Sequence, residues 1–121
     1  MLLWTARTAA LGTVGVALYL TLSPDPTGAG LLPPWAGHLG IFAGVGASFA
    51  LLRHASGWAA SRLNLLTLAV VALSATTEVG QSFTGRDPDL IDLTLDLTGG
   101  LSAMFASDAL LARLRGRPAR D

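Results

Sequence analysis

Long stretches of this chain carry no formal charge, and this spacing limits the possible folds more than any other feature. Seventeen uncharged residues separate Arg7 from Asp25, and 27 residues, interrupted only by His38, separate Asp25 from Arg53. Two further stretches, of 15 and 11 residues, follow later. A helix needs roughly 20 residues to cross a hydrocarbon core about 30 Å thick. We therefore predict four membrane-spanning helices, at about 2–22, 35–52, 63–83 and 89–111.

The composition agrees with an all-α integral membrane bundle. Apolar residues make up 51% of the chain and charged residues 13%, against about 25% charged in a typical soluble domain. The absence of cysteine excludes disulfides and thiolate metal sites, and a net charge of zero argues against nucleic-acid binding. We expect one domain over residues 1–121 in the cell membrane, with lipids as partners and no metal ion or cofactor. Oligomerisation stays open.

The positions of the arginines predict the orientation of the bundle. The N-terminus, the loop between the second and third spans, and a basic tail at 112–121 would share one side. Because positively charged loops stay in the cytoplasm, we predict that both termini are cytoplasmic and that Arg86 alone lies outside. A cleavable signal peptide is not expected, since Arg7 lies inside the first apolar stretch. The arginines on the cytoplasmic side are Arg7, Arg53, Arg62, Arg113, Arg115, Arg117 and Arg120.

A tight turn is predicted at 84–88, between the third and fourth spans. Asp87 would cap the fourth helix, Pro88 would take its first position, and Asp89 would complement the helix dipole. The proline and glycine residues between 23 and 34 predict an irregular loop. Trp58, in the short loop before the third span, is suited to a membrane interface.

Ionisable residues gather around this turn. Glu78 precedes Arg86 by eight residues, and Asp92 and Asp96 follow it by six and ten, so an antiparallel helix pair would hold the carboxylates at similar depths. A charged group inside a membrane costs about 2.5–3.5 kcal/mol on insertion scales, which drives it toward the bundle interior. We expect one outward-facing polar cluster of six residues: His38, Glu78, Gln81, Arg86, Asp92 and Asp96.

Two interpretations of this cluster are open at the level of sequence. It forms a functional pocket, or it fastens neighbouring helices together through interhelical hydrogen bonds. We interpret Asp108 as structural, with Arg7 or Arg113 neutralising it near the cytoplasmic end. Small residues on apolar helices predict close packing. The glycines expected at such contacts are Gly40, Gly44, Gly99 and Gly100.

The residues around the turn also carry a family pattern. Residues 78–99 read EVGQSFTGRDPDLIDLTLDLTG, and this segment resembles the signature of the VanZ-like family of bacterial membrane proteins. That signature has Glu, Gln three positions later, Arg five further on, Asp six further on, Asn after another four, and then Gly. The matching residues are Glu78, Gln81, Arg86, Asp92 and Gly99.

The chain departs from this pattern at two places. Asp96 stands where the family usually has Asn, and Pro34 and Trp35 stand where it tends to have Asp-Lys, shortly before a His that His38 matches. The resemblance implies a four-span protein of the cell envelope. It also implies a link to antibiotic resistance, because the family's namesake is associated with low-level resistance to the glycopeptide teicoplanin.

Three functional hypotheses follow. In the first, the chain is not an enzyme, and the cluster binds an amphiphile such as a lipid-linked wall precursor or a glycopeptide, with Arg86 on its phosphate or carboxylate. In the second, Glu78 or Asp92 is the general base of a membrane enzyme with His38 as partner, or the carboxylates hold a divalent ion. The third is proton-linked transport, which would need an oligomer because four short helices lack inverted repeats.

Overall fold

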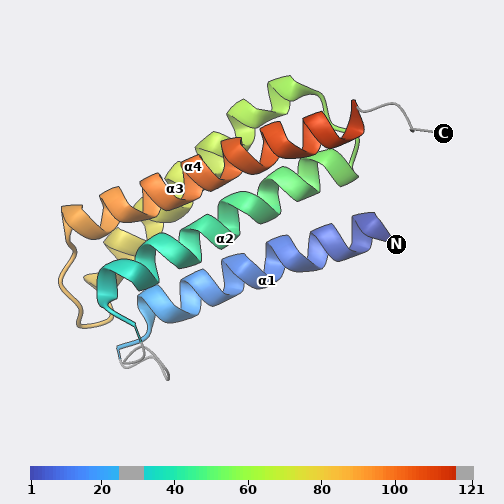
Figure 1. The fold of residues 1–121 in the computed structure, drawn as a ribbon. Helices are drawn as coiled ribbons and strands as arrows, with labels where there is room; N and C mark the ends of the chain where they lie inside the picture. The colour runs from blue at the N-terminus through green and yellow to red at the C-terminus, as the bar shows by residue number, and fades with distance from the viewer. Residues whose placement is uncertain (25–31, 117–121) are drawn as a thin grey trace.

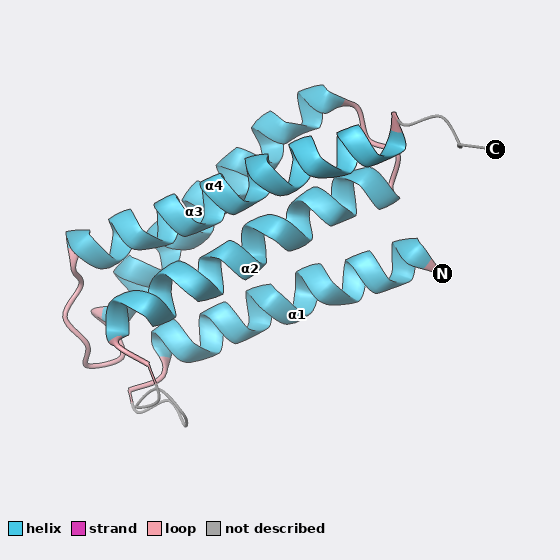
Figure 2. Cartoon of the chain, viewed as in Figure 1, coloured by secondary structure: helices cyan, strands magenta, loops and turns pink. Residues whose placement is uncertain are grey.

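The fold consists of four α-helices in a computed structural model that describes residues 1–24 and 32–116. The helices are α1 (Leu2–Leu22), α2 (Pro34–Ala55), α3 (Leu63–Gln81) and α4 (Leu90–Arg115), with a short 3-10 helix at Ala60–Arg62. The described ranges contain no strand (Figure 2). The all-α prediction is confirmed, and each of the four predicted stretches overlaps one helix.

Successive helices run in opposite directions (Figure 1). As a result α2 and α4 are parallel to each other, and α2 makes its most extensive contacts with α4. We call one end of the bundle the terminal end; it carries the start of α1, the connection between α2 and α3, and the end of α4. The opposite end, which we call the turn end, carries the start of α2 and the connection at 82–89 between α3 and α4.

Glycines allow the backbones of α2 and α4 to touch. A Cβ atom added to Gly46 would collide with the carbonyl oxygen of Gly100, and one added to Gly99 would collide with the carbonyl oxygen of Leu39. A Cβ on Gly100 would lie 2.6 Å from a methyl group of Val70 in α3. Gly99 and Gly100 therefore lie where α4 approaches α2 and α3 closely, and Gly46 is a third close approach that was not expected from the sequence.

The other two glycines expected at packing contacts behave differently. A Cβ atom on Gly40 would meet no described residue within 4 Å, so Gly40 takes no part in packing among residues 1–24 and 32–116. One on Gly44 would lie 3.8 Å from the methyl carbon of Thr13 in α1, which is an ordinary van der Waals distance. The GxxxG spacing thus marks small residues without showing which of them faces a neighbouring helix.

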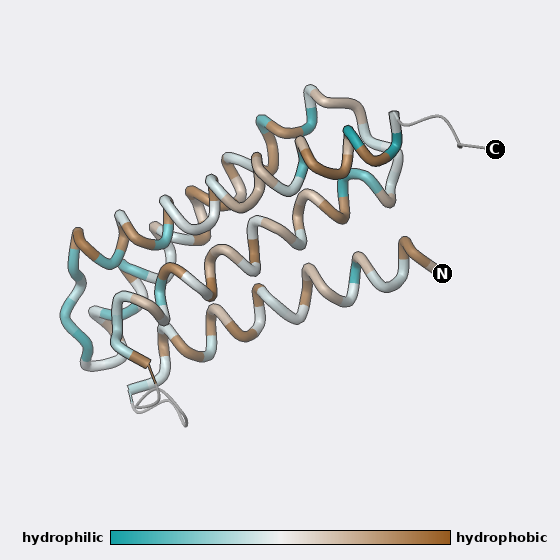
Figure 3. The backbone as a smooth tube through the Cα atoms, viewed as in Figure 1, coloured by the Kyte–Doolittle hydropathy of each residue, from teal (hydrophilic) through white to brown (hydrophobic). Residues whose placement is uncertain are grey.

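The interior of the bundle is as polar as it is apolar. Among the described residues ten polar or charged side chains are buried, against nine apolar ones. Large apolar side chains instead remain exposed on every helix, among them Leu11 of α1, Trp35 of α2, Leu68 of α3 and Phe105 of α4. In Figure 3 the middle of the bundle is largely white to brown, and strong teal marks the turn end and the ends of α2 and α4. Apolar side chains are therefore spread over both the surface and the interior of the bundle, and the interior also holds many polar ones.

Two helical stretches are long and apolar enough to cross a membrane. They are Pro34–Ala55 and Ala60–Gln81, each of 22 residues.

The apolar contacts inside the bundle form two groups. One consists of Ala50, Leu66, Val70 and Met104, and the other of Ala17, Phe42 and Val45. Both groups include residues of α2, so α2 is the central helix of the packing.

The start of α4 differs from the prediction. The capping residue is Asp89, whose carboxylate accepts a hydrogen bond of 2.8 Å from the Ile91 backbone N–H, and neither Asp87 nor Pro88 is helical. The reason is a tertiary contact, because the Asp89 backbone N–H donates to the carboxylate of Glu78 in α3. This contact holds the segment before α4 in an extended conformation.

The remaining helix ends either coincide with the prediction or lie within four residues of it. α3 ends at Gln81, and the chain turns through Gly85, whose φ of 78° favours glycine. α4 continues to Arg115, four residues past the predicted 111, with Arg113 and Arg115 in its last turn, where cations are favourable. Parts of the predicted loop at 23–34 and of the basic tail at 112–121 lie outside the described residues, namely 25–31 and 117–121.

Candidate functional site

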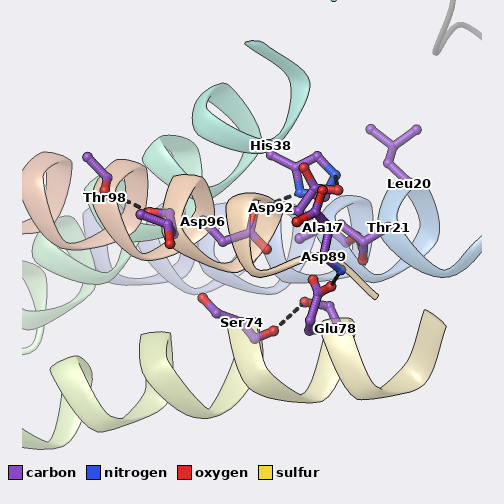
Figure 4. Close-up of polar contacts among 12 residues, drawn as sticks. Ala17, Leu20, Thr21, His38, Ser74, Glu78, Asp89, Asp92, Asp96 and Thr98 are labelled. Atoms are coloured by element: carbon purple, nitrogen blue, oxygen red, sulfur yellow. Dashed lines mark hydrogen bonds and ion pairs between the residues drawn. The ribbon is translucent and has the colours of Figure 1, made fainter. Parts of the chain in front are cut away.

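The centre of the candidate site is His38, which lies between two aspartates at the turn end (Figure 4). Its Nδ1 atom is 2.9 Å from Oδ1 of Asp96, and its Nε2 atom is 3.3 Å from Oδ2 of Asp92. Both ring nitrogens therefore face carboxylate oxygens, which only accept hydrogen bonds when ionised. A doubly protonated ring would donate to both carboxylates at once.

Packing of α4 on α2 brings these three side chains together. His38 lies in the second turn of α2, and Asp92 and Asp96, four residues apart, share one face of α4. Directly below them, Gly99 lets α4 approach the carbonyl oxygen of Leu39. Leu39 directly follows His38, and Gly99 lies three residues after Asp96. The contact between Leu39 and Gly99 therefore fixes the distance between the imidazole and the carboxylates.

Exposure decreases along this row of side chains. The side chain of Asp92 is 24% exposed, that of His38 is 8% exposed, and that of Asp96 is 1% exposed. A molecule that reached the site from the turn end would meet Asp92 first and Asp96 last.

Glu78 of α3 belongs to the same region. One carboxylate oxygen accepts the hydrogen bond from the Asp89 backbone, and its charge interacts with those of Asp92, Asp96 and His38. Glu78 is 7% exposed, although it lies only three residues before the end of α3. The site thus joins three helices, with the imidazole from α2, two carboxylates from α4 and one from α3.

Three buried polar atoms in this region have no hydrogen-bond partner among the described residues: Oε2 of Glu78, Nε2 of Gln81 and Oδ2 of Asp96. Leaving a buried donor or acceptor unpaired costs about 1–3 kcal/mol, and more when the group is charged. Native proteins contain few such atoms, so each needs a physical reason. Glu78 and Gln81 lie three residues apart at the end of α3, and Asp96 lies beside His38, so all three atoms belong to the turn end.

Arg86 does not bind these carboxylates. Its Nη1 atom donates to the carbonyl oxygens of Leu20 and Thr21, at 3.1 and 3.0 Å, at the end of α1. The last carbonyls of a helix lack partners within the helix, and a cation is favourable there. Arg86 therefore ties α1 to the turn between α3 and α4. Of the six predicted members, the structure joins His38, Asp92 and Asp96 directly.

A second polar cluster lies at the terminal end, and the sequence analysis did not predict it. Asp108 of α4 accepts a hydrogen bond of 2.5 Å from Nε of Arg53 and forms an ion pair of 2.5 Å with Nη2 of the same guanidinium, and its Oδ1 lies 3.0 Å from Nε2 of His54. Nη1 of Arg53 donates to the carbonyl oxygen of Trp58 at 2.9 Å. This cluster fastens the end of α4 to the end of α2 and to the following loop.

The expected partners of Asp108 were wrong. Arg53 of α2 neutralises it, whereas the guanidinium of Arg7 lies 5.5 Å from the ring centre of Trp4. Arg113 lies in the last turn of α4 and is exposed. Arg53 and His54 are adjacent in the sequence, just before the turn at Gly57. This pair could have indicated the partners of Asp108, but only with the knowledge that α2 and α4 are neighbours.

Within residues 1–24 and 32–116, no group of three or more His, Cys, Asp or Glu side chains is arranged to hold a metal ion. Comparisons of the chain with protein-family models, curated proteins and solved structures gave no match. The resemblance to the VanZ-like family therefore stays a prediction that rests on the residues of the turn.

Proposed function

We propose that all four helices span a membrane and that both termini are cytoplasmic. The helices have 21, 22, 19 and 26 residues, and at 1.5 Å per residue the shortest is about 28 Å long, close to the thickness of a hydrocarbon core. Exposed apolar side chains on all four helices support this proposal, since lipid would cover them. The polar interior supports it too, because intramembrane ionisable groups face the inside of a bundle.

The distribution of charge supports the orientation. The terminal end holds five of the arginines in the described chain, whereas the turn end holds only Arg86. The positive-inside rule then assigns the terminal end to the cytoplasm and the turn end to the outside. The arginines of the terminal end are Arg7, Arg53, Arg62, Arg113 and Arg115.

Cysteine labelling would test this topology, since the chain contains no native cysteine. Ala59→Cys places a thiol in the exposed loop after α2, and Ser82→Cys places one in the exposed turn after α3. In intact cells a membrane-impermeant maleimide should label Ser82→Cys, and it should label Ala59→Cys only after lysis. Equal labelling of both positions in intact cells would refute the four-span orientation.

For the function itself, we propose that the turn-end cluster, which consists of His38, Glu78, Asp92 and Asp96, binds the head group of an amphiphile of the cell envelope. The observation that carries this proposal is the set of three unpaired buried polar atoms, which belong to the end of α3 and to the first turns of α4. A head group with hydrogen-bonding groups would satisfy them, while its chain would lie against the exposed apolar faces of the helices. Asp92, as the most exposed member of the row, provides the point of entry.

The turn pattern, which resembles the VanZ-like signature, connects this binding function with resistance to teicoplanin. We propose that the wild-type chain protects a sensitive host and that Glu78→Gln and Asp92→Asn, at equal membrane levels, do not. Asp87→Asn is the matched control, because Asp87 is an exposed acid of the same turn outside the cluster. If the wild-type chain gives no protection, the link to resistance is refuted. If the three variants protect equally, the cluster has no part in it.

A further inference from the structure

The charge of the turn-end cluster identifies the kind of head group that fits it. Three carboxylates, those of Glu78, Asp92 and Asp96, surround one imidazole, so at least two negative charges are uncompensated when all three are ionised. If one carboxyl takes up a proton, the cluster with a charged His38 is still negative. While the cluster keeps this negative charge, it repels an anionic head group.

The charge of Arg86 acts on His38 and offsets one of these negative charges, but Arg86 does not pair with the carboxylates. It is the one arginine at the turn end of the described chain, and its Nη1 atom is directed to the carbonyl oxygens of Leu20 and Thr21 in α1. The sequence-based hypothesis paired Arg86 with a phosphate or carboxylate of the ligand. In the structure Arg86 instead completes the end of α1, so a ligand anion would have to compete with two helix carbonyls for it.

The unpaired atoms point to the same chemistry. Two of the three are carboxylate oxygens, Oε2 of Glu78 and Oδ2 of Asp96, on side chains that are 7% and 0% exposed. A buried carboxylate oxygen without a partner needs a donor, and a charged donor binds it most strongly. A primary ammonium group has three N–H donors and a positive charge, which suits two carboxylate oxygens and the partly exposed Asp92.

We propose that the turn-end cluster binds the ammonium group of a cationic amphiphile. This inference rests on the proposed binding function and names its ligand class. The acyl or alkyl chain lies against the apolar helix faces, and the ammonium group replaces the missing donors at Glu78 and Asp96. The cluster then selects amine head groups over phosphate and hydroxyl head groups.

The test uses the full-length protein in phosphatidylcholine nanodiscs and three probes with the same chain: dodecylammonium, dodecanol and dodecyl phosphate. The chain has only two histidines, so the ring nitrogens of His38 can be followed by ¹⁵N NMR during each titration. We expect dodecylammonium to shift the His38 signals and to bind at least tenfold more tightly than the other two probes.

Two variants locate the binding site. Asp96→Asn should weaken dodecylammonium binding at least tenfold, and Glu78→Gln, a second variant in case the first does not fold, should weaken it as well. Asp87→Asn removes one negative charge from the same turn outside the cluster, and it should change the affinity less than twofold. Equal effects of Asp87→Asn and Asp96→Asn would show attraction to the surface charge only and would overturn the proposal.

The outcomes separate this inference from the proposed function. If the cluster variants weaken binding of all three probes equally, amphiphile binding stands and the preference for an ammonium group is refuted. If dodecyl phosphate binds most tightly, the preference is refuted in favour of an anionic ligand. If no probe shifts the His38 signals, both the binding of single-chain amphiphiles at the cluster and the preference for an ammonium group are refuted.

Discussion

The contact between Gly46 and Gly100 gives the most direct test of the fold, through the variant Gly46→Ala. The added Cβ atom would collide with the carbonyl oxygen of Gly100 and would lie 2.9 Å from its carbonyl carbon and 3.0 Å from the backbone nitrogen of Met104. These are backbone atoms, which cannot rotate away as a side chain can. The helices α2 and α4 must therefore move apart.

The size of the effect follows from this geometry. Restoring an ordinary contact of 3.4 Å to the Gly100 carbonyl carbon, from 2.9 Å, requires about half an ångström, and the carbonyl oxygen lies closer still, so the two backbones must separate by more than this. A gap of about 0.5–1 Å removes a quarter to a half of the dispersion attraction between facing atoms. Overpacking of this kind costs about 1–3 kcal/mol, while the change from glycine to alanine in a helix returns about 0.5–1 kcal/mol. We expect a net loss of about 1–2 kcal/mol.

Gly40→Ala is the matched control, since Gly40 lies in the same helix and an added Cβ there meets nothing within 4 Å. It should leave the protein as stable as the wild type or slightly more stable. Reversible unfolding of both variants in mixed micelles, followed by circular dichroism, would measure the difference. If Gly46→Ala were as stable as Gly40→Ala, the direct backbone contact between α2 and α4 would be refuted.

Two further predictions concern the polar contacts at the ends of the bundle. Asp108→Asn leaves the buried guanidinium of Arg53 without its carboxylate. It should lower the free energy of unfolding in mixed micelles by about 3 kcal/mol. An unchanged free energy of unfolding would mean that this ion pair does not hold α4 on α2. Arg86→Gln removes the donor to the carbonyl oxygens of Leu20 and Thr21, and faster amide hydrogen exchange should follow in the last turn of α1 but not in α2. Unchanged exchange in that turn would argue against the contact.

Much of the fold could be predicted because it depends on local properties of the chain. The lengths of the uncharged stretches located all four helices, with α1 at the predicted 2–22 and every other end within four residues of its predicted position. The start of α4 was the exception. Asp87 and Pro88 have the local properties of a helix start, but the bond between the Asp89 backbone and Glu78 of α3 moved the cap by two residues. A contact between helices therefore overrode a local preference.

The candidate site was predicted as a set of residues and not as a set of contacts. Glu78, Asp92 and Asp96 could be identified because a charged side chain in an apolar stretch is costly. That cost does not depend on how the helices pack. The partners of these residues were harder to identify. His38 bridges Asp92 and Asp96, whereas Arg86 turned to α1, because the end of a neighbouring helix offered it two carbonyl oxygens.

By itself, then, the sequence determined an all-helical chain, the lengths of its helices, and the separation of basic and acidic residues between the two ends of the bundle. These properties depend on residues close together in the chain. Only the tertiary structure decided that α2 and α4 are parallel neighbours, that Gly46 meets Gly100, and that Asp108 pairs with Arg53. The physical reason is that these helices carry apolar residues on most of their surface, so no single face of a helix indicates which helix packs against it. Successive residues also point in directions about 100° apart around the helix axis, so the sequence does not specify which side chains meet a neighbouring helix.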